Sequence, residues 1–124
     1  MYEIMVKGHF SAAHSLKEIG GECEGLHGHN FIVEASVSSP TLLPTGVVID
    51  FRVLKKNLGD SIDTLDHVNL NELAPFTKVN PSSENLAKYI HGELKRRLSA
   101  LHFTGKLRVS VWESENSRAT YFEG

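Results

Sequence analysis

Residues 27–38 read His27-Gly28-His29-Asn30-Phe31-Ile32-Val33-Glu34-Ala35-Ser36-Val37-Ser38. From His27 onward, every second side chain is either an imidazole or apolar, and this period of two predicts a β-strand with one buried face. The imidazoles occupy one end of that face and the apolar residues the other. The segment therefore places a candidate metal site at the edge of a hydrophobic core.

The segment from Tyr2 to His14 alternates in the same way and supplies a third imidazole. His14 shares the parity of the apolar residues of this segment, although a bulge at Gly8 would shift that register. Catalytic zinc usually takes three protein ligands and keeps its fourth position for water or substrate. We therefore interpret His14, His27 and His29 as the ligands of one zinc ion. A single histidine on an apolar face would more simply be a core residue, but three from two neighbouring strands favour the metal.

Cys23 is the only cysteine of the chain and lies just before this histidine pair. A lone thiol cannot form an internal disulfide, and near several histidines it is a candidate nucleophile. The alternative is a small buried hydrophobic residue, which is the usual state of a free cysteine.

The rest of the chain predicts two helices followed by two strands. Asp50 is expected to cap a helix with the apolar stripe Phe51, Leu54, Leu58, Ile62 and Leu65, and Pro81-Ser82 to begin a second helix with the stripe Leu86, Ile90, Leu94, Leu98 and Leu101. Strands are expected from Lys106 to Glu113 and from Arg118 to Phe122. The order ββααββ predicts an α+β fold in which a four-stranded antiparallel sheet carries both helices on one face. Its open edges favour assembly of several subunits.

Two further groups of polar residues could carry chemistry. Asp66-His67 follows the first predicted helix, within a segment expected to be a loop, and could form a proton relay if that loop is bent. Capping and exposure at the surface are the simpler interpretation of such a pair. Glu113 continues the apolar parity of its strand, so it is expected either to meet a partner or ligand or to lie at a frayed strand end.

Length and charge limit the classes of function. The 124 residues suit one domain, 1–124, and the net charge of -2 gives no basic surface for nucleic acid. No apolar run approaches the ~20 residues that span a bilayer, and the N-terminus does not resemble a signal peptide. We therefore expect a soluble, cytoplasmic protein without nucleic-acid or membrane partners.

Five segments, taken in order, resemble the 6-pyruvoyltetrahydropterin synthase family, which includes the 6-carboxytetrahydropterin synthases of queuosine biosynthesis. They are Phe10-Ser11-Ala12-Ala13-His14, Cys23-x-x-x-His27-Gly28-His29, Leu65-Asp66-His67-x-x-Leu70-Asn71, Pro81-Ser82-Ser83-Glu84-Asn85 and Val111-x-Glu113. The resemblance implies the tunnelling fold, in which subunits join their sheets into a barrel, commonly as a homo-hexamer with active sites between subunits. It also implies zinc on His14, His27 and His29, a catalytic group of Cys23, Asp66 and His67, and a pterin ring held by Glu113 with help from Ser82 and Ser83.

The implied reaction is that of a zinc-dependent lyase on 7,8-dihydroneopterin triphosphate. In the queuosine branch, which we favour, triphosphate and acetaldehyde leave and 6-carboxy-5,6,7,8-tetrahydropterin remains. Glu24 keeps an alternative open, because some relatives use a glutamate spaced Glu-x-x-His-Gly-His to cleave the side chain to 6-hydroxymethyl-7,8-dihydropterin for folate synthesis. Formation of 6-pyruvoyltetrahydropterin, the tetrahydrobiopterin branch, is the other alternative. Ser15 departs from the basic residue that many relatives carry there, so Lys17 or Arg118 is the candidate contact for the triphosphate.

Two interpretations belong to other classes of protein. A non-catalytic binding module would use zinc only for stability, with Cys23 as a fourth ligand that closes the site. A small metallohydrolase would instead use zinc-bound hydroxide on phosphate esters.

Overall fold

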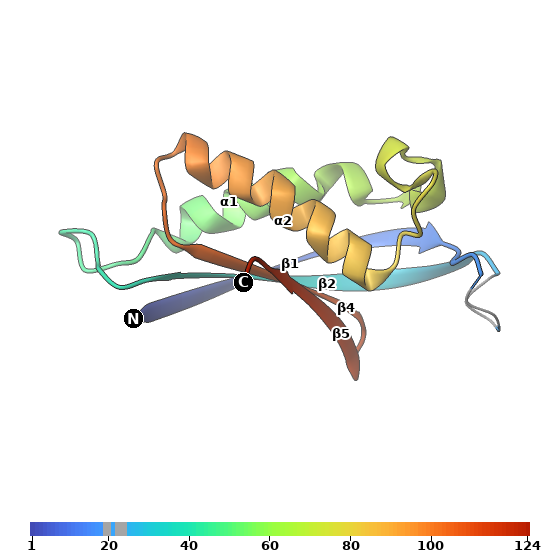
Figure 1. Cartoon of the computed structure of the whole chain (residues 1–124), viewed down its shortest axis with the longest axis horizontal. Helices are drawn as coiled ribbons and strands as arrows, with labels where there is room; N and C mark the ends of the chain where they lie inside the picture. Colours follow the sequence, from blue (N-terminus) through green and yellow to red (C-terminus); the bar gives the residue numbers. More distant parts are fainter. Residues whose placement is uncertain (19–20, 22–24) are drawn as a thin grey trace.

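A computed structural model describes residues 1–18, 21 and 25–124 of the chain. Its helices and strands form two layers, a twisted sheet and a pair of helices on one of its faces (Figure 1). In chain order the elements are β1 (Tyr2–His14), β2 (His27–Ser39), α1 (Phe51–Ile62), η2 (Asp63–Leu65), β3 (Val68–Asn69), η3 (Leu70–Glu72), η4 (Ala74–Phe76), α2 (Ser83–Ala100), β4 (Lys106–Ser114) and β5 (Ser117–Phe122), where η marks a short 3-10 helix.

The sheet has five strands in the order β3-β1-β2-β4-β5. Three pairings are antiparallel, as expected, but β3 pairs in parallel with β1 through Ala12 and Val68. The prediction of a four-stranded, purely antiparallel sheet is therefore wrong by one strand. The extra strand comes from the segment predicted as a loop, and two residues are too few to show an alternation.

The pairing of β1 with β2 runs without a break from Tyr2 opposite Ser39 to His14 opposite His27. Gly8 lies within this ladder opposite Val33, so no bulge shifts the parity of β1 there. Close packing of α1 explains the glycine: a Cβ at position 8 would lie 3.0 Å from Cδ1 of Ile62. The register therefore carries the alternation of both strands to the end of the sheet, where the imidazoles lie.

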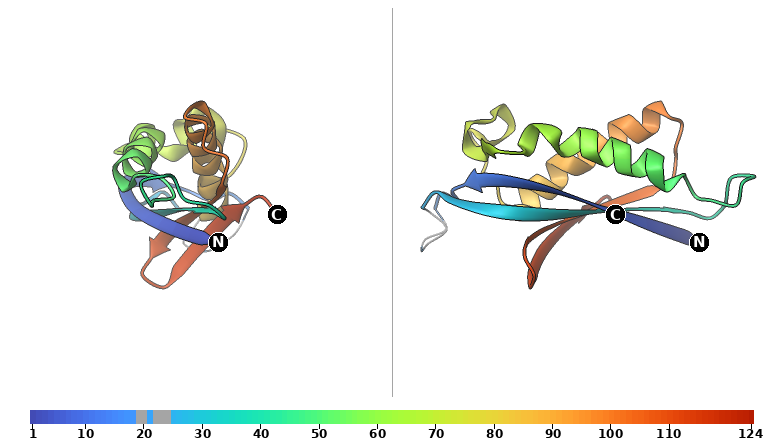
Figure 2. Two further views of the ribbon diagram at one scale, coloured as in Figure 1. Left: turned by 90° about the vertical axis from the view of Figure 1, so that its left-hand side faces the viewer. Right: turned by 180° about the vertical axis from the view of Figure 1, so that it is seen from behind.

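The hydrophobic core fills the space between the sheet and the helices, and the end-on view shows both helices side by side over the strands (Figure 2). Both predicted stripes contribute, through Leu54, Leu58, Ile62, Leu65, Leu86, Ile90, Leu94 and Leu98, which are all buried. Phe51 and Leu101 are corrections, because they are 57% and 51% exposed. Each lies at the end of a helix: Phe51 is the first residue of α1, and Leu101 follows the last residue of α2.

Side-chain caps fix where the two helices begin. Asp50 accepts a hydrogen bond from the main-chain N–H of Arg52, and the Ser82 hydroxyl accepts one from the N–H of Asn85, as the sequence predicts for N-caps. Among the described residues, no helix has the length and apolar character needed to cross a membrane.

Candidate functional site

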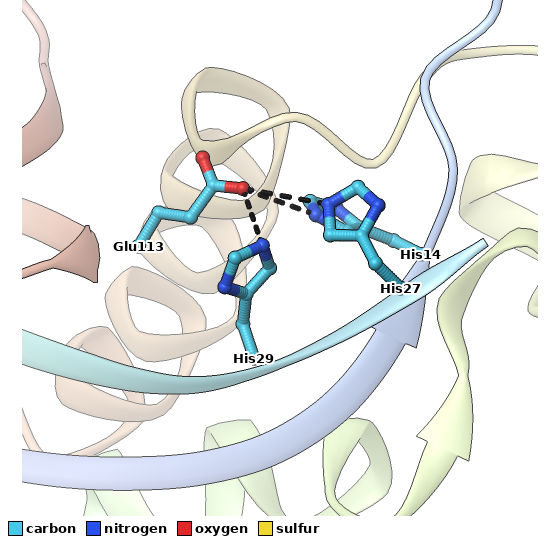
Figure 3. Close-up of side chains that lie close together, drawn as sticks. All are labelled: His14, His27, His29 and Glu113. Atoms are coloured by element: carbon cyan, nitrogen blue, oxygen red, sulfur yellow. Dashed lines mark hydrogen bonds and ion pairs between the residues drawn. The ribbon is translucent and has the colours of Figure 1, made fainter. Parts of the chain in front are cut away.

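Three imidazoles converge at the end of the sheet (Figure 3). The β1–β2 register sets His14 opposite His27 and Ala12 opposite His29, so the period of two turns all three rings to the core side. The ring centroids of His14 and His27 are 4.6 Å apart, and those of His27 and His29 are 4.7 Å apart. The predicted histidine group therefore forms.

Glu113 reaches the same point from β4 (Figure 3). The β4–β5 pairing is irregular between Trp112 and Ser114, and Glu113 lies at this irregularity. Its Oε1 lies 2.9 Å from Nε2 of His29, 3.3 Å from Nε2 of His14 and 3.8 Å from Nε2 of His27. The carboxylate that continued the apolar parity thus meets partners rather than hanging from a frayed strand.

The four residues suit a zinc ion in geometry and in ligand chemistry. One ligand atom from each of them lies within 4.8 Å of every other. Tetrahedral zinc with bonds of 2.0–2.1 Å holds its ligand atoms about 3.3 Å apart, and Oε1 of Glu113 lies 2.9 to 3.8 Å from the three ring nitrogens, as a group beside one shared ion would. Three imidazoles are a known donor set for catalytic zinc, so His14, His27 and His29 would be its protein ligands.

Main-chain carbonyls orient two of the rings. Nδ1 of His14 donates to the Pro81 carbonyl at 2.7 Å, and Nδ1 of His27 donates to the Gly25 carbonyl at 2.7 Å. Because a carbonyl only accepts, each ring carries a proton on Nδ1 and turns its Nε2 toward the centre, where Oε1 of Glu113 lies. This arrangement makes Nε2 the atom that a metal would bind.

The surroundings favour the neutral form of the His29 ring. The His14 side chain is 0% exposed, and edge-on contacts with Phe31 line the inner side of His14 and His29. Burial lowers the pKa of His29, the charges of His27 and His14 lower it further, and the carboxylate of Glu113 opposes them. A neutral His29 keeps its lone pair available to a cation.

Asp66 and His67 form a second group at the edge of β1. The loop is bent, because His67 has a φ of 57°, and this bend brings Nδ1 of His67 to 2.9 Å from Oδ2 of Asp66. The main chain of Ser11 holds the pair from both sides: its N–H donates to Oδ1 of Asp66 at 2.8 Å, and its carbonyl accepts the N–H of His67 at 2.6 Å. The hydrogen bond from Ser11 lowers the pKa of Asp66, and the bond from His67 lowers it further. We call this pair the Asp66–His67 dyad.

The dyad opens to a different side of the sheet from the imidazoles. An open hollow of about 480 Å³ beside it is lined by Ser11, Ala13, Gly28, Asn30 and His67, and also by Ala12 and His29 of the core-facing set. The first four alternate along β1 and β2 with the residues that face the core, so the hollow lies mainly on the face without helices. The His67 side chain is 81% exposed. Within one chain, the dyad and the histidine group therefore lie on opposite faces of the same two strands.

The two serines predicted to hold a pterin differ in their contacts. The Ser82 hydroxyl caps α2, whereas the Ser83 hydroxyl is buried and has no hydrogen-bond partner among the described residues. Ser83 therefore has a free donor close to the segment that orients His14. Cys23 and Glu24 lie outside the described residues, so their roles stay predictions.

Several main-chain contacts that organise the site give no signal in the sequence. The carbonyls of Pro81 and Gly25 and the main chain of Ser11 organise the two groups. Main-chain groups are the same at nearly every residue and leave no mark in the sequence. The N-cap signal at Ser82 indicates only that a helix begins near the segment that contacts His14.

Comparison with known proteins matches the chain to one protein family, in sequence and in fold. Residues 3–124 match the family described as 6-pyruvoyl tetrahydropterin synthase. A dihydroneopterin monophosphate aldolase of Pyrococcus furiosus is 37% identical over 111 residues, which cover 89% of this chain and 88% of the relative. A 6-carboxy-5,6,7,8-tetrahydropterin synthase of Synechocystis is 36% identical over 128 residues, with 98% and 94% covered. The solved structure of 6-pyruvoyl tetrahydropterin synthase from Caenorhabditis elegans has a TM-score of 0.85 and 28% identity, with 99% and 96% covered.

Proposed function

This chain belongs to the 6-pyruvoyl tetrahydropterin synthase family, and we propose that it is a zinc-dependent 6-carboxy-5,6,7,8-tetrahydropterin synthase that acts on 7,8-dihydroneopterin triphosphate. The observation that carries the proposal is the convergence of three imidazoles and one carboxylate at the end of the sheet. Relatives in Synechocystis, Aquifex aeolicus and Bacillus subtilis that bear this name support the choice of product. The pathway would then be queuosine biosynthesis.

In this proposal, Glu113 and Ser83 hold the pterin ring. A carboxylate accepts two parallel hydrogen bonds from the amino-pyrimidinone edge of a pterin, and the side chain of Glu113 is 30% exposed and so accessible. The buried Ser83 hydroxyl, without a partner among the described residues, is the second contact. The ring would thus be fixed on the core side of the sheet, with the substrate side chain toward the histidines.

The histidines would present their Nε2 atoms to zinc, which when bound polarises the hydroxyl oxygens of the substrate side chain and acidifies adjacent groups. Cys23, as a thiolate, would remove a proton from the side chain, and His67 would move a second one. Asp66 would hold His67 with its proton on Nδ1, which leaves Nε2 as the base. The net reaction consumes one water, and the oxidation of the side chain is balanced by reduction of the ring within the same substrate, so no redox cofactor is required.

The placement of the dyad supports an assembly in which neighbouring subunits share each site. His67 is exposed on the face opposite the histidine group, so it would serve the substrate of an adjacent copy. The outer strands are β5 and the two-residue β3, which pairs only with Ala12 and Ala13 of β1, so β5 and the rest of β1 leave open edges that suit the joining of sheets into a barrel. We propose a homo-hexamer built in this way.

A second candidate function is supported by the aldolase of Pyrococcus furiosus, which is 37% identical to this chain. Glu24 has the spacing of the glutamate that cleaves side chains in some relatives. In this reaction a dihydroneopterin phosphate would lose its side chain as an aldehyde and leave 6-hydroxymethyl-7,8-dihydropterin.

Product analysis separates the candidates. Purified protein loaded with zinc is incubated with dihydroneopterin triphosphate, and in parallel with dihydroneopterin monophosphate, and the products are identified by mass spectrometry. The proposal expects 6-carboxytetrahydropterin, triphosphate and acetaldehyde from the triphosphate, and loss of that product in Cys23→Ala. If Cys23→Ala keeps its activity while Glu24→Ala loses it, the aldolase function replaces the proposal.

A further inference from the structure

Two asparagine side chains pair with the main chain just beyond His14. Nδ2 of Asn80 donates to the Lys17 carbonyl at 2.9 Å, and Oδ1 accepts the Lys17 N–H at 2.8 Å. Asn71 forms the same pair of bonds with Ser15, at 2.9 and 2.8 Å. Each amide thus acts as the neighbouring strand would, and together they extend the hydrogen bonding of β1 past its last residue.

Asn80 has a second connection that Asn71 lacks. It directly precedes Pro81, whose carbonyl accepts the Nδ1 proton of His14 at 2.7 Å. The main-chain carbonyl of Asn80 in turn accepts a hydrogen bond from Nδ2 of Asn85 in α2, at 2.8 Å. Asn80 therefore joins the chain that follows His14 to the segment that orients the His14 ring.

The orientation of His14 depends on this segment because the ring is completely buried. Its side chain is 0% exposed, so solvent is not at hand to replace the Pro81 carbonyl as a partner for Nδ1. If the carbonyl moved away, Nδ1 would lose its buried partner, and the ring would no longer be held with Nε2 toward the centre. A histidine turned away from the centre cannot bind the ion there.

We propose that Asn80 is a positioning residue for the metal centre: it fixes the Pro81 carbonyl against Nδ1 of His14 and thereby keeps Nε2 of that ring directed at the ion. The inference rests on the proposed function, since it concerns the same histidine group. A main-chain carbonyl cannot be removed by substitution. The side-chain amide of Asn80 is therefore the part of this support that a variant can change.

Asn71 provides a matched control. Asn80→Ala and Asn71→Ala each remove one donor and one acceptor from the segment after His14, at Lys17 and Ser15 respectively. Asn71 belongs to η3 and has no bond to the Pro81 segment among the described residues. Both variants are therefore expected to lower the melting temperature of the metal-free protein to a similar extent, and only Asn80→Ala is expected to disturb His14.

The first measurement is the exchange with water of the Nδ1 proton of His14, followed by ¹H–¹⁵N NMR of the histidine rings in metal-free protein. Wild type and Asn71→Ala should show slow exchange, because the buried proton is hydrogen-bonded to the Pro81 carbonyl, and Asn80→Ala should show faster exchange. The second measurement is zinc affinity by competition with a chelator. Loss of a residue that supports a metal ligand typically weakens affinity about 10- to 100-fold, and this loss is expected for Asn80→Ala alone.

Asn80→Asp is a second variant in case Asn80→Ala fails to fold, because it keeps the shape of the side chain and the acceptor for the Lys17 N–H. Its loss of zinc affinity is expected to lie between those of wild type and Asn80→Ala. Equal losses of affinity in the Asn71 and Asn80 variants, or an unchanged exchange rate of the His14 Nδ1 proton in Asn80→Ala, would overturn the inference. If wild type binds no zinc, the proposed function fails, and the exchange measurement alone then decides the role of Asn80.

Discussion

Oε1 of Glu113 lies 2.9 Å from Nε2 of His29 and within 3.8 Å of Nε2 in both other histidines. One carboxylate oxygen therefore lies where three ring nitrogens converge. Such a carboxylate can be a fourth zinc ligand, which would close the site, or it can hold a pterin while three histidines bind the metal and leave a position open. The two roles predict different zinc retention when the carboxylate is removed.

Glu113→Ala is expected to retain zinc and to lose most activity. Three histidines suffice for a catalytic site, whereas hydrogen bonds to a charged group contribute about 1.5–3 kcal/mol, so kcat/KM should fall roughly 10- to 150-fold. Metal content after dialysis and steady-state kinetics measure the two effects, with His29→Ala as the control that should lose the metal. If Glu113→Ala loses zinc as readily as His29→Ala, the carboxylate is a ligand and the catalytic interpretation of the site is wrong.

Ser82→Ala and Ser83→Ala are expected to have opposite effects. The Ser82 hydroxyl caps α2, so its loss should lower stability by about 1 kcal/mol and leave KM unchanged. The Ser83 hydroxyl has no partner among the described residues, so its loss should spare stability. A lost hydrogen bond of about 0.5–1.5 kcal/mol to the pterin should raise KM roughly 2- to 10-fold. Thermal unfolding and kinetics of both variants test this, and a raised KM in Ser82→Ala instead would contradict it.

His91 is expected to make the fold sensitive to mild acid. It is 3% exposed, and its Nε2 donates to the Leu107 carbonyl at 3.2 Å. Burial lowers its pKa from 6.5, the Leu107 bond and Glu123 oppose this shift, and Lys95 adds to it. Because the unfolded chain then binds the proton first, stability is constant above the unfolded pKa and falls as the pH drops from there toward the lowered folded pKa.

His91→Gln tests this, because its amide can still donate to Leu107. Urea unfolding at about pH 7.5 and about pH 5.5 should show a smaller difference in the free energy of unfolding for the variant than for wild type. His29, whose pKa burial also lowers, contributes in both proteins and cancels in the comparison. Equal differences in the two proteins would show that His91 does not cause the acid sensitivity.

The parts of the fold in which apolar residues recur with a regular period could be predicted. A period of two in residues 2–14 and 27–38 determines which side chains share a face, and pairing these strands brings His14 opposite His27. The helical stripes place most of the core for the same reason. Phe51 and Leu101 fall outside it because a stripe shows which side of a helix is apolar but not how far along the helix that side is buried.

The rest depends on contacts between segments far apart in the sequence. β3 consists of two residues next to the clamp that the Ser11 main chain makes on Asp66 and His67, and no local pattern predicts that clamp. Gly8 looked like a bulge, but the reason for it is the approach of Ile62. The parity of Glu113 placed its side chain correctly, yet parity says nothing about whether the carboxylate faces a metal or a pterin.

Asp66→Asn is expected to remove the base without changing the metal site. The asparagine oxygen can still accept the Ser11 N–H, but its NH₂ group then faces Nδ1 of His67 and forces the proton onto Nε2. Loss of general base catalysis typically costs 10²- to 10⁴-fold, so kcat should fall by about that factor with zinc content unchanged. Single-turnover measurements on metal-loaded protein test this. An unchanged kcat would remove the dyad from the mechanism.

Mixed oligomers test whether the dyad serves a neighbouring subunit. Asp66→Asn spoils the exposed dyad, and His29→Ala spoils the histidine group on the opposite face of the same strands. Suppose that each site takes its dyad from one copy and its metal from another. A site is then intact only if the His29→Ala subunit supplies the dyad and the Asp66→Asn subunit supplies the metal. With equal amounts mixed at random, about one quarter of the sites should meet both conditions. The two variants, carrying different tags, are co-expressed, purified over both tags and assayed against each variant alone. Activity no higher than that of the separate variants would place the dyad and the metal of each site on the same chain, and the shared-site assembly would then be wrong.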